Sequence, residues 1–158
     1  RRSFDSRIRA ALVAASTAGT PLALVLIDID RFKALNDTLG HAYGDTCLSQ
    51  VAAVLRQQLQ RKGDMVARLG GEEFGVILAH TDAQAAIHHP APVNDCGLTI
   101  SLGLASWRPQ PGCAADLDQL LQLADNCLYA AKDQGRDRLV AAALGEGEDG
   151  ADPAGMVR

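Results

Sequence analysis

Basic charge, long apolar runs and paired cysteines are all scarce in this sequence. Its formal net charge is −4, so the chain lacks the basic face that a nucleic-acid surface requires, and we expect no nucleic-acid partner. No apolar run reaches the length of a membrane span and no signal peptide opens the chain, so we expect a soluble, cytoplasmic segment. The 4 cysteines show no CxxC spacing, which favours reduced thiols over disulfides: Cys47, Cys96, Cys113 and Cys127.

The length of 158 residues suits one domain that can bury most of the surface its unfolded chain would expose. We expect this domain to span residues 1–144. The segment after it is rich in glycine and acid: Gly145-Glu146-Gly147-Glu148-Asp149-Gly150-Ala151-Asp152-Pro153. Such a composition buries too little apolar surface to fold, so we expect residues 145–158 to form a disordered acidic tail.

Hydrophobic periodicity alternates between helix and strand along the chain. It predicts helices over Phe4 to Ala15, Arg31 to Leu39, Asp45 to Leu59 and Asp116 to Asp133. It predicts strands over Leu22 to Asp30, Met65 to Leu69, Phe74 to Leu78, Leu98 to Ala105 and Arg138 to Ala142. This order indicates an α+β sandwich in which helices cover a mixed or antiparallel sheet.

Two glycines stand directly before two carboxylates where the predicted hairpin turns. Gly70 and Gly71 permit a tight turn with positive φ and let a bulky ligand approach the backbone. Glu72 and Glu73 at the adjoining strand edge could hold a hard cation. A plain hairpin with solvated acids explains these residues equally well when they are taken alone.

A second acidic pair ends the first predicted strand. Asp28 and Asp30 lie on the same side of that strand because strand residues alternate faces. Charges beside a core are tolerated when they are paired or when they bind metal. If the two acid-tipped strands lie side by side, Asp28, Glu72 and Glu73 together have the composition of a two-metal site for phosphoryl transfer.

Four motifs follow one another at characteristic spacings: Asp28-Ile29-Asp30-Arg31-Phe32-Lys33; Asn36-Asp37-Thr38-Leu39-Gly40-His41 with Gly44-Asp45; Gly70-Gly71-Glu72-Glu73-Phe74; and Leu128-Tyr129-Ala130-Ala131-Lys132 with Gly135-Arg136. Through them the chain resembles the GGDEF domain of bacterial diguanylate cyclases, in the GGEEF variant of the signature, from about Arg1 to Val140. The resemblance implies a palm-like fold similar to class III nucleotide cyclases, with a central, mostly antiparallel sheet covered by helices. Arg1-Arg2-Ser3-Phe4 look like the tail of the family's opening motif. This implies a domain cut from a longer protein, whose sensory or membrane region lies ahead of it.

The resemblance implies a signalling enzyme that joins two GTP molecules into cyclic di-GMP and releases pyrophosphate, in a homodimer of such domains with Mg²⁺ or Mn²⁺. Each ribose 3′-hydroxyl attacks the other nucleotide's α-phosphate, so positioning and charge neutralisation carry the chemistry. By resemblance, Asp28 and Glu73 bind the metal together with the Ile29 carbonyl, and Glu72 binds metal or deprotonates the hydroxyl. Which glutamate takes which role stays open.

Three cations are candidates for the phosphates. Lys33 lies early in the helix after the first strand, where free backbone N–H groups also occur, and the resemblance places it among the catalytic residues. Lys132 and Arg136 are four residues apart near the end of the last predicted helix, and so on one face where the helix persists. Helix C-termini favour cations in any case. The resemblance adds four further residues to the substrate site: Gly70, Gly71, Phe32 and His41, of which His41 shapes its loop.

Guanine recognition needs a donor and an acceptor that face the amide edge of the base. Asn36 and Asp45 match the family's base-recognition positions, and such a site rejects adenine through unpaired polar groups. A purely structural interpretation has Asn36 at the end of one helix and Asp45 as the cap of the next, and both interpretations are compatible.

An RxxD string, Arg61-Lys62-Gly63-Asp64, lies at the family's spacing before Gly70 and implies an inhibitory site for the product. Arginine can bind guanine O6 and N7 or a phosphate with two hydrogen bonds, and aspartate can accept from guanine N1. An exposed turn would carry the same residues for solubility alone.

The chain departs from the family between His80 and Gly97, where Pro90 and Pro92 end a helix predicted from Thr81 to His89. No motif residue is lost there. An active cyclase is therefore the preferred hypothesis, and a cyclic di-GMP or GTP receptor without turnover is the alternative. A cyclase with another base preference is a third hypothesis, against which Asn36 and Asp45 speak. We expect His80, His88 and His89 to be surface residues.

Overall fold

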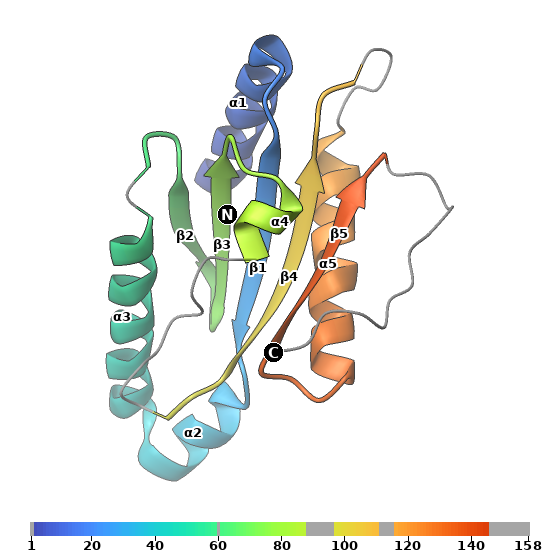
Figure 1. The fold of residues 1–158 in the computed structure, drawn as a ribbon. Coiled ribbons are helices and arrows are strands. Elements are labelled where there is room, and N and C mark those ends of the chain that lie inside the picture. The colour runs from blue at the N-terminus through green and yellow to red at the C-terminus, as the bar shows by residue number, and fades with distance from the viewer. Residues whose placement is uncertain (1, 60, 88–96, 111–115, 146–158) are drawn as a thin grey trace.

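A computed structural model describes residues 2–59, 61–87, 97–110 and 116–145. Its helices are α1 (Arg2–Ala18), α2 (Phe32–Leu39), α3 (His41–Gln58), α4 (Ala83–Ile87) and α5 (Leu117–Asp133). Its strands are β1 (Leu22–Ile29), β2 (Met65–Gly70), β3 (Glu73–Ala79), β4 (Ile100–Trp107) and β5 (Arg138–Leu144). The expected α+β sandwich is confirmed (Figure 1).

The five strands form one sheet in the order β2-β3-β1-β4-β5. The pairs β2–β3, β3–β1 and β1–β4 are antiparallel, whereas β4 and β5 run parallel. Parallel pairing needs a crossover, which α5 supplies between β4 and β5. The sheet is therefore mixed and mostly antiparallel, as the sequence predicted.

Strand β1 is central and apolar on both faces, which fits a strand covered by helices on both sides. Leu22, Leu24 and Leu26 belong to a core that includes buried residues of α1 and α5. Ala23, Val25 and Ile27 belong to a second core, which includes buried residues of α2, α3 and α4. The alternation of side chains along β1 thus separates the two helical layers.

Two glycines let helices pack closely on the sheet. A Cβ at Gly75 in β3 would touch the ring of Phe4 in α1, at 2.5 Å from Cζ. A Cβ at Gly103 in β4 would collide with the backbone of α5 at Ala124 and Leu128. Helices α1 and α5 can therefore lie close to one face of the sheet, because Gly75 and Gly103 carry no side chain there.

Several strand and helix ends lie together at one end of the sheet, which we call the Gly70 end (Figure 1). The end of β1, the turn between β2 and β3, and the starts of β4 and β5 lie here. Helix α2 and the last turn of α5 lie at the same end. Most of the predicted motifs end or begin at these positions.

One predicted boundary is wrong for an identifiable reason. Helix α3 begins at His41 rather than Asp45, because Gly40 alone separates α2 from α3. The N–H of Gly40 donates to the Asn36 carbonyl at 2.9 Å and closes α2, and the Gly44 N–H donates to the Gly40 carbonyl at 3.3 Å and opens α3. Asp45 is thus an interior helix residue and not a cap.

The predicted short helix after Thr81 is present as α4, Ala83–Ile87. His88, His89, Pro90 and Pro92 lie outside the described residues, as do Cys96, Cys113 and the predicted tail from residue 146. Cys47 and Cys127 are buried. In the part of the chain that the structure describes, no helix is long and apolar enough to cross a membrane.

Candidate functional site

Two acidic residues face each other across neighbouring strands at the Gly70 end. Asp28 of β1 is the register partner of Glu73 in β3. Directly opposed residues point to the same face with Cα atoms about 4.5–5.5 Å apart. The side-by-side arrangement of the two acid-tipped strands, on which the sequence argument depended, is therefore present.

Asp28 is paired with a cation from the next layer. The Lys132 ammonium of α5 lies 2.8 Å from a carboxylate oxygen of Asp28, whose side chain is only 13% exposed. Burial nevertheless holds the pKa of Asp28 above its ordinary value, because desolvation outweighs the hydrogen bond and charge of Lys132. The negative charges of Glu72 and Asp30 act in the same direction. The Asp28 carboxylate is thus paired with Lys132 at a position where burial penalises its charge.

The turn between the acidic strands is open on its outer side. Gly70 and Gly71 have φ values of 153° and 52°, and a Cβ at either position would meet nothing within 4 Å. Arg68 Nε closes the turn by donating to the Gly71 carbonyl at 2.8 Å. The Ile29 N–H donates to the Glu72 carbonyl at 3.3 Å, which ties the turn to the end of β1. A ligand can therefore approach this backbone without meeting side chains of the turn.

Asp30 has a role that the sequence argument missed. It is 4% exposed, and its carboxylate accepts hydrogen bonds from the Thr99 hydroxyl at 2.8 Å, the Ser101 hydroxyl at 2.7 Å and the Asp137 N–H at 3.1 Å. It therefore ties the end of β1 to the start of β4 and to the turn before β5. The signal in the sequence was the cost of a buried acid, which requires partners of this kind.

The basic residue Arg136 lies in that turn and not on the helix, so the condition for a shared face with Lys132, a helix that persists to Arg136, is not met. Helix α5 ends at Asp133, Gly135 has a φ of 113°, and Arg136 itself has a φ of 67°. The Arg136 N–H donates to the Ala131 carbonyl at 2.9 Å. A glycine-led cap thus ends the helix before Arg136, whose side chain is exposed.

Helix α2 and the start of α3 carry the remaining predicted substrate residues. Lys33, in the first turn of α2, and His41, the first residue of α3, are exposed. Phe32 is 7% exposed in the second core, so only its backbone can meet a nucleotide. Asn36 lies within α2 and not at its end, and Asp45 is exposed in the second turn of α3.

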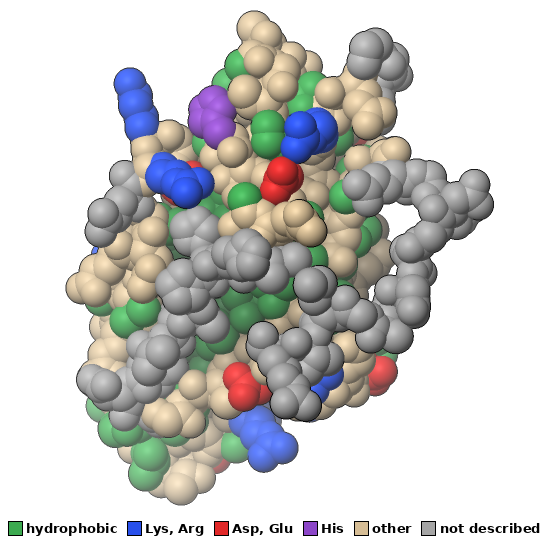
Figure 2. Space-filling view, viewed as in Figure 1, with side chains coloured by type: hydrophobic (Ala, Val, Ile, Leu, Met, Phe, Trp, Pro, Cys, Tyr) green, Lys and Arg blue, Asp and Glu red, His purple; other side chains and the backbone are tan. Residues whose placement is uncertain are grey.

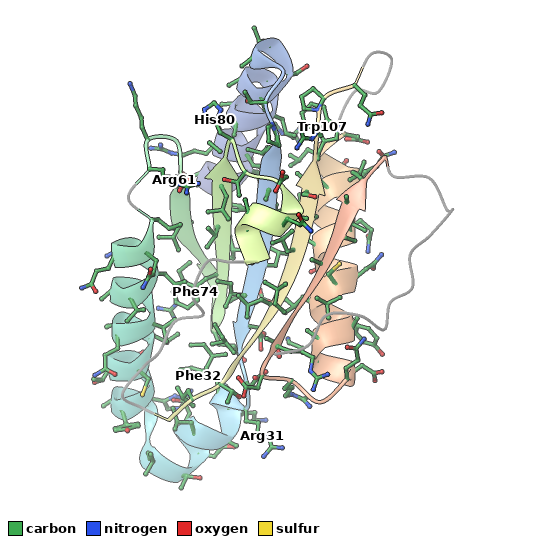
Figure 3. The ribbon with its side chains drawn as sticks, in the orientation of Figure 1. Arg31, Phe32, Arg61, Phe74, His80 and Trp107 are labelled. Atoms are coloured by element: carbon green, nitrogen blue, oxygen red, sulfur yellow. The ribbon has the colours of Figure 1, made fainter. Side chains whose placement is uncertain are left out.

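The RxxD residues lie at the opposite end of the β2–β3 hairpin (Figure 3, where Arg61 and Arg31 mark the two ends). Arg61 is exposed. Asp64 accepts a hydrogen bond from the Ala79 N–H at 3.0 Å through one carboxylate oxygen, while its other oxygen is buried with no partner among the described residues. Asp64 therefore holds the start of β2 to the end of β3.

The acidic residues of the Gly70 end fit a hard divalent cation. Within the described ranges, no group of three or more His, Cys, Asp or Glu side chains is arranged to hold a metal by itself. Mg²⁺ does not need such a cage, because it is commonly bound by one or two carboxylates together with water and substrate phosphates. Asp28 and Glu73 lie opposite each other, so a cation bound there could be held by two carboxylates. Asp28 and Glu73 would be its carboxylate ligands, and Glu72 lies in the adjoining turn, where it could bind metal or accept a proton.

Comparison with known proteins decides the family. The family model for the diguanylate cyclase GGDEF domain matches residues 1–138. The chain belongs to this family. It carries the GGDEF fold, with a five-strand mixed sheet covered by helices, over the region that the motifs span.

Relatives of this GGDEF domain cover nearly all of it. Diguanylate cyclase TpbB from Pseudomonas aeruginosa is 42% identical over 86% of this chain. A crystal structure of the TpbB GGDEF domain superposes with a TM-score of 0.78 at 38% identity, covering 91% of this chain and 96% of that one. The structure of an active GGEEF domain of a diguanylate cyclase from Vibrio cholerae has a TM-score of 0.76 at 28% identity, covering 90% and 95%. The GGDEF domain of DgcB from Caulobacter crescentus, solved in complex with cyclic di-GMP, has a TM-score of 0.73 at 30% identity, covering 90% and 89%.

The chain spans about a third of the length of the curated relatives it matches: 34% of TpbB and 32% of diguanylate cyclase DosC from Escherichia coli.

Proposed function

We propose that this GGDEF domain is a catalytically active, GGEEF-type diguanylate cyclase domain that condenses two GTP molecules into cyclic di-GMP. The observation that carries the proposal is the pairing of Asp28 with Glu73 beside the open glycine turn, with Lys132 on the same side. Phosphoryl transfer requires this combination of clustered carboxylates, cations and unobstructed backbone. The related domain from Vibrio cholerae, described as active, carries a GGEEF signature.

The reaction forms two bonds, each between the ribose 3′-oxygen of one GTP and the α-phosphorus of the other, and it breaks the two bonds from those phosphorus atoms to their pyrophosphates, so that two pyrophosphates leave. The hydroxyl proton passes to a carboxylate, for which Glu72 is the candidate because it adjoins the turn but is not the register partner of Asp28. A bound Mg²⁺ or Mn²⁺ would lower the hydroxyl pKa and neutralise phosphate charge. Asp28, Glu73 and the Ile29 carbonyl would hold it.

Phosphate charge would be met from two sides of the Gly70 end. Lys33 stands in the first turn of α2, where free N–H groups also point outward. Lys132, whose ammonium is paired with Asp28, would turn to a phosphate oxygen when a divalent cation takes its place beside Asp28. Arg136, held in its turn after α5, would complete the set.

Two such domains have to face each other, because each brings one GTP. The RxxD residues Arg61 and Asp64 would form an inhibitory product site away from the Gly70 end, in which exposed Arg61 is the contact to the product and Asp64, with a buried carboxylate oxygen, holds the turn. The domain of DgcB in complex with cyclic di-GMP supports product binding by a related domain. Since the chain covers a third of its relatives, the signal that controls the domain would come from the remainder of a longer protein.

The test is incubation of the domain with GTP and Mg²⁺ over a range of protein concentrations, with products separated by chromatography. We expect cyclic di-GMP and pyrophosphate to form with a steeper than linear dependence on protein concentration. Glu73→Ala is the matched inactive variant, because it removes the carboxylate opposite Asp28 from an exposed position. Equal turnover by Glu73→Ala would contradict the metal assignment.

The receptor hypothesis has one observation in its favour. Lys132 already neutralises Asp28, so the acid can persist without metal in a domain that only binds nucleotides. The same assay separates the two hypotheses. A domain that forms no product even when a fused dimeriser holds two copies together, yet binds cyclic di-GMP, would be a receptor.

A further inference from the structure

The contact between α2 and α3 leaves no room for a side chain at Gly44. Gly44 is buried in the first turn of α3, and a Cβ there would collide with Oδ1 of Asn36 and approach Phe32 Cζ to 3.1 Å. Phe32 is fixed in the second core and has little freedom to retreat. Gly44 is thus the position over which the Asn36 carboxamide lies.

The same contact fixes which end of the carboxamide is offered to a ligand. Asn36 Oδ1 is buried and has no hydrogen-bond partner among the described residues. The amide nitrogen Nδ2 is not among the buried unpartnered atoms, and it too makes no hydrogen bond within the described ranges, so it is open to solvent. An asparagine held this way is a donor to its ligand, because its acceptor is turned into the protein.

We propose that Gly44 is a positioning residue for guanine recognition: its missing side chain lets Asn36 turn Oδ1 into the α2–α3 contact and present Nδ2 to an acceptor on the guanine edge. This inference rests on the proposed function. Exposed Asp45, the next residue along α3, supplies the complementary acceptor for guanine N1 and the 2-amino group. Adenine offers the opposite pattern on that edge, so a donor-only Asn36 disfavours it.

The experiment is a double-mutant cycle read by nucleotide binding. Wild type, Asn36→Ala, Gly44→Ala and the double variant are titrated with 3′-deoxy-GTP and 3′-deoxy-ATP in Mg²⁺, because these nucleotides cannot be condensed. We expect each single variant to lose about tenfold in affinity for the guanine nucleotide and little for the adenine nucleotide, as for one lost hydrogen bond. The double variant should bind no more weakly than Asn36→Ala alone. Ala42→Ser, which adds one atom at an exposed position of the same helical turn, should change nothing.

A further variant keeps the test independent of how Gly44→Ala folds. Asn36→Asp preserves shape but cannot donate, so guanine affinity should fall at least as far as in Asn36→Ala. Retained affinity in Asn36→Asp, additive losses in the cycle, or equal losses for both nucleotides would overturn the inference while leaving the cyclase proposal in place. A wild-type domain that binds neither nucleotide would overturn both.

Discussion

Asp28 and Asp30 lie two residues apart at the end of β1, but their surroundings give them different roles. Asp30 is buried with three hydrogen-bond donors around its carboxylate. Asp28 has one cationic partner, Lys132, and a pKa raised chiefly by burial. Asp30 thus has the hydrogen-bond partners of a structural acid, whereas Asp28, with one cationic partner, is the acid that the proposed function assigns to a metal.

We expect Asp28→Asn to stabilise the nucleotide-free domain at neutral pH while abolishing turnover, because the desolvation of the Asp28 charge outweighs its attraction to Lys132. The folded pKa of Asp28 is raised above 3.8, so its protonated form favours folding. That stabilisation is complete below 3.8 and is lost as pH rises through the raised pKa. The gap between variant and wild type should therefore widen from acid to neutral pH.

Urea denaturation between pH 3 and pH 8, without nucleotide or divalent cation, measures this gap. Asp37→Asn, at an exposed position of α2, is the control and should show no such widening. A gap that is constant with pH would mean that the Asp28 charge is not penalised in the fold.

Asp30→Ala should destabilise the domain by about 3 kcal/mol, because it leaves the hydroxyls of Thr99 and Ser101 and the Asp137 N–H without their hydrogen-bond acceptor. The turn that carries Arg136 would loosen with it, so GTP affinity should fall as well. Denaturation and GTP titration measure the two effects, and Asp37→Ala is the control. Unchanged stability would show that water replaces the carboxylate without cost.

At the scale of the elements, periodicity predicted every strand and the long helices to within a few residues. The largest boundary error lies where a single glycine acts. Gly40 both ends α2 and opens α3, so the expected cap at Asp45 was wrong. The predicted end of α5 at Asp133 is the observed one, and Arg136 follows it in a turn in which Gly135 has positive φ, so Lys132 and Arg136 share no helix face. Local patterns do not reveal such turns, because they depend on φ values that only the folded chain fixes.

The candidate site was predictable to a similar extent. Strand pattern and acid position placed Asp28 beside Glu73, and the register confirms that the two residues are opposed. The partners of Asp30 are 69 to 107 residues away in sequence, so no local signal could identify them. Likewise, the close approach of Asn36 to Gly44 follows from the packing of α2 on α3 and not from either helix alone.

The packing of α5 on β4 yields a graded prediction. Gly103→Ala should cost about 3 kcal/mol or more, because the new Cβ meets the immovable backbone of α5 at Ala124 and Leu128. Gly75→Ala should cost less, about 1–2 kcal/mol, because the Phe4 ring can shift. Thermal and urea denaturation rank the two variants. The reverse order would mean that α1 is held more rigidly than α5.

At the scale of the whole molecule, the β2–β3 hairpin joins two chemically distinct ends. Its turn carries Gly70, Gly71 and the acids, while the opposite end carries Arg61 and Asp64 (Figure 3). Basic side chains are scattered over the face shown in Figure 2 and form no continuous patch among the residues described there. The phosphate-bearing ligands of the proposed function would therefore depend on a few placed cations at either end, which agrees with a net charge of −4.

The separation of the two ends makes Arg61→Ala the sharpest test of product inhibition. Asp64 also holds β2 to β3 through the Ala79 N–H, so its substitution would mix stability with binding, whereas Arg61 is exposed. Loss of a bidentate arginine contact to guanine or phosphate should weaken inhibition by cyclic di-GMP about 10- to 100-fold. The initial rate of GTP turnover should be unchanged. Inhibition curves on initial rates measure this, with Lys62→Ala in the same exposed turn as the matched control. If Arg61→Ala kept the wild-type inhibition constant, the RxxD residues would form only a solvated turn. If it lost turnover instead, the two ends of the hairpin would be coupled in catalysis.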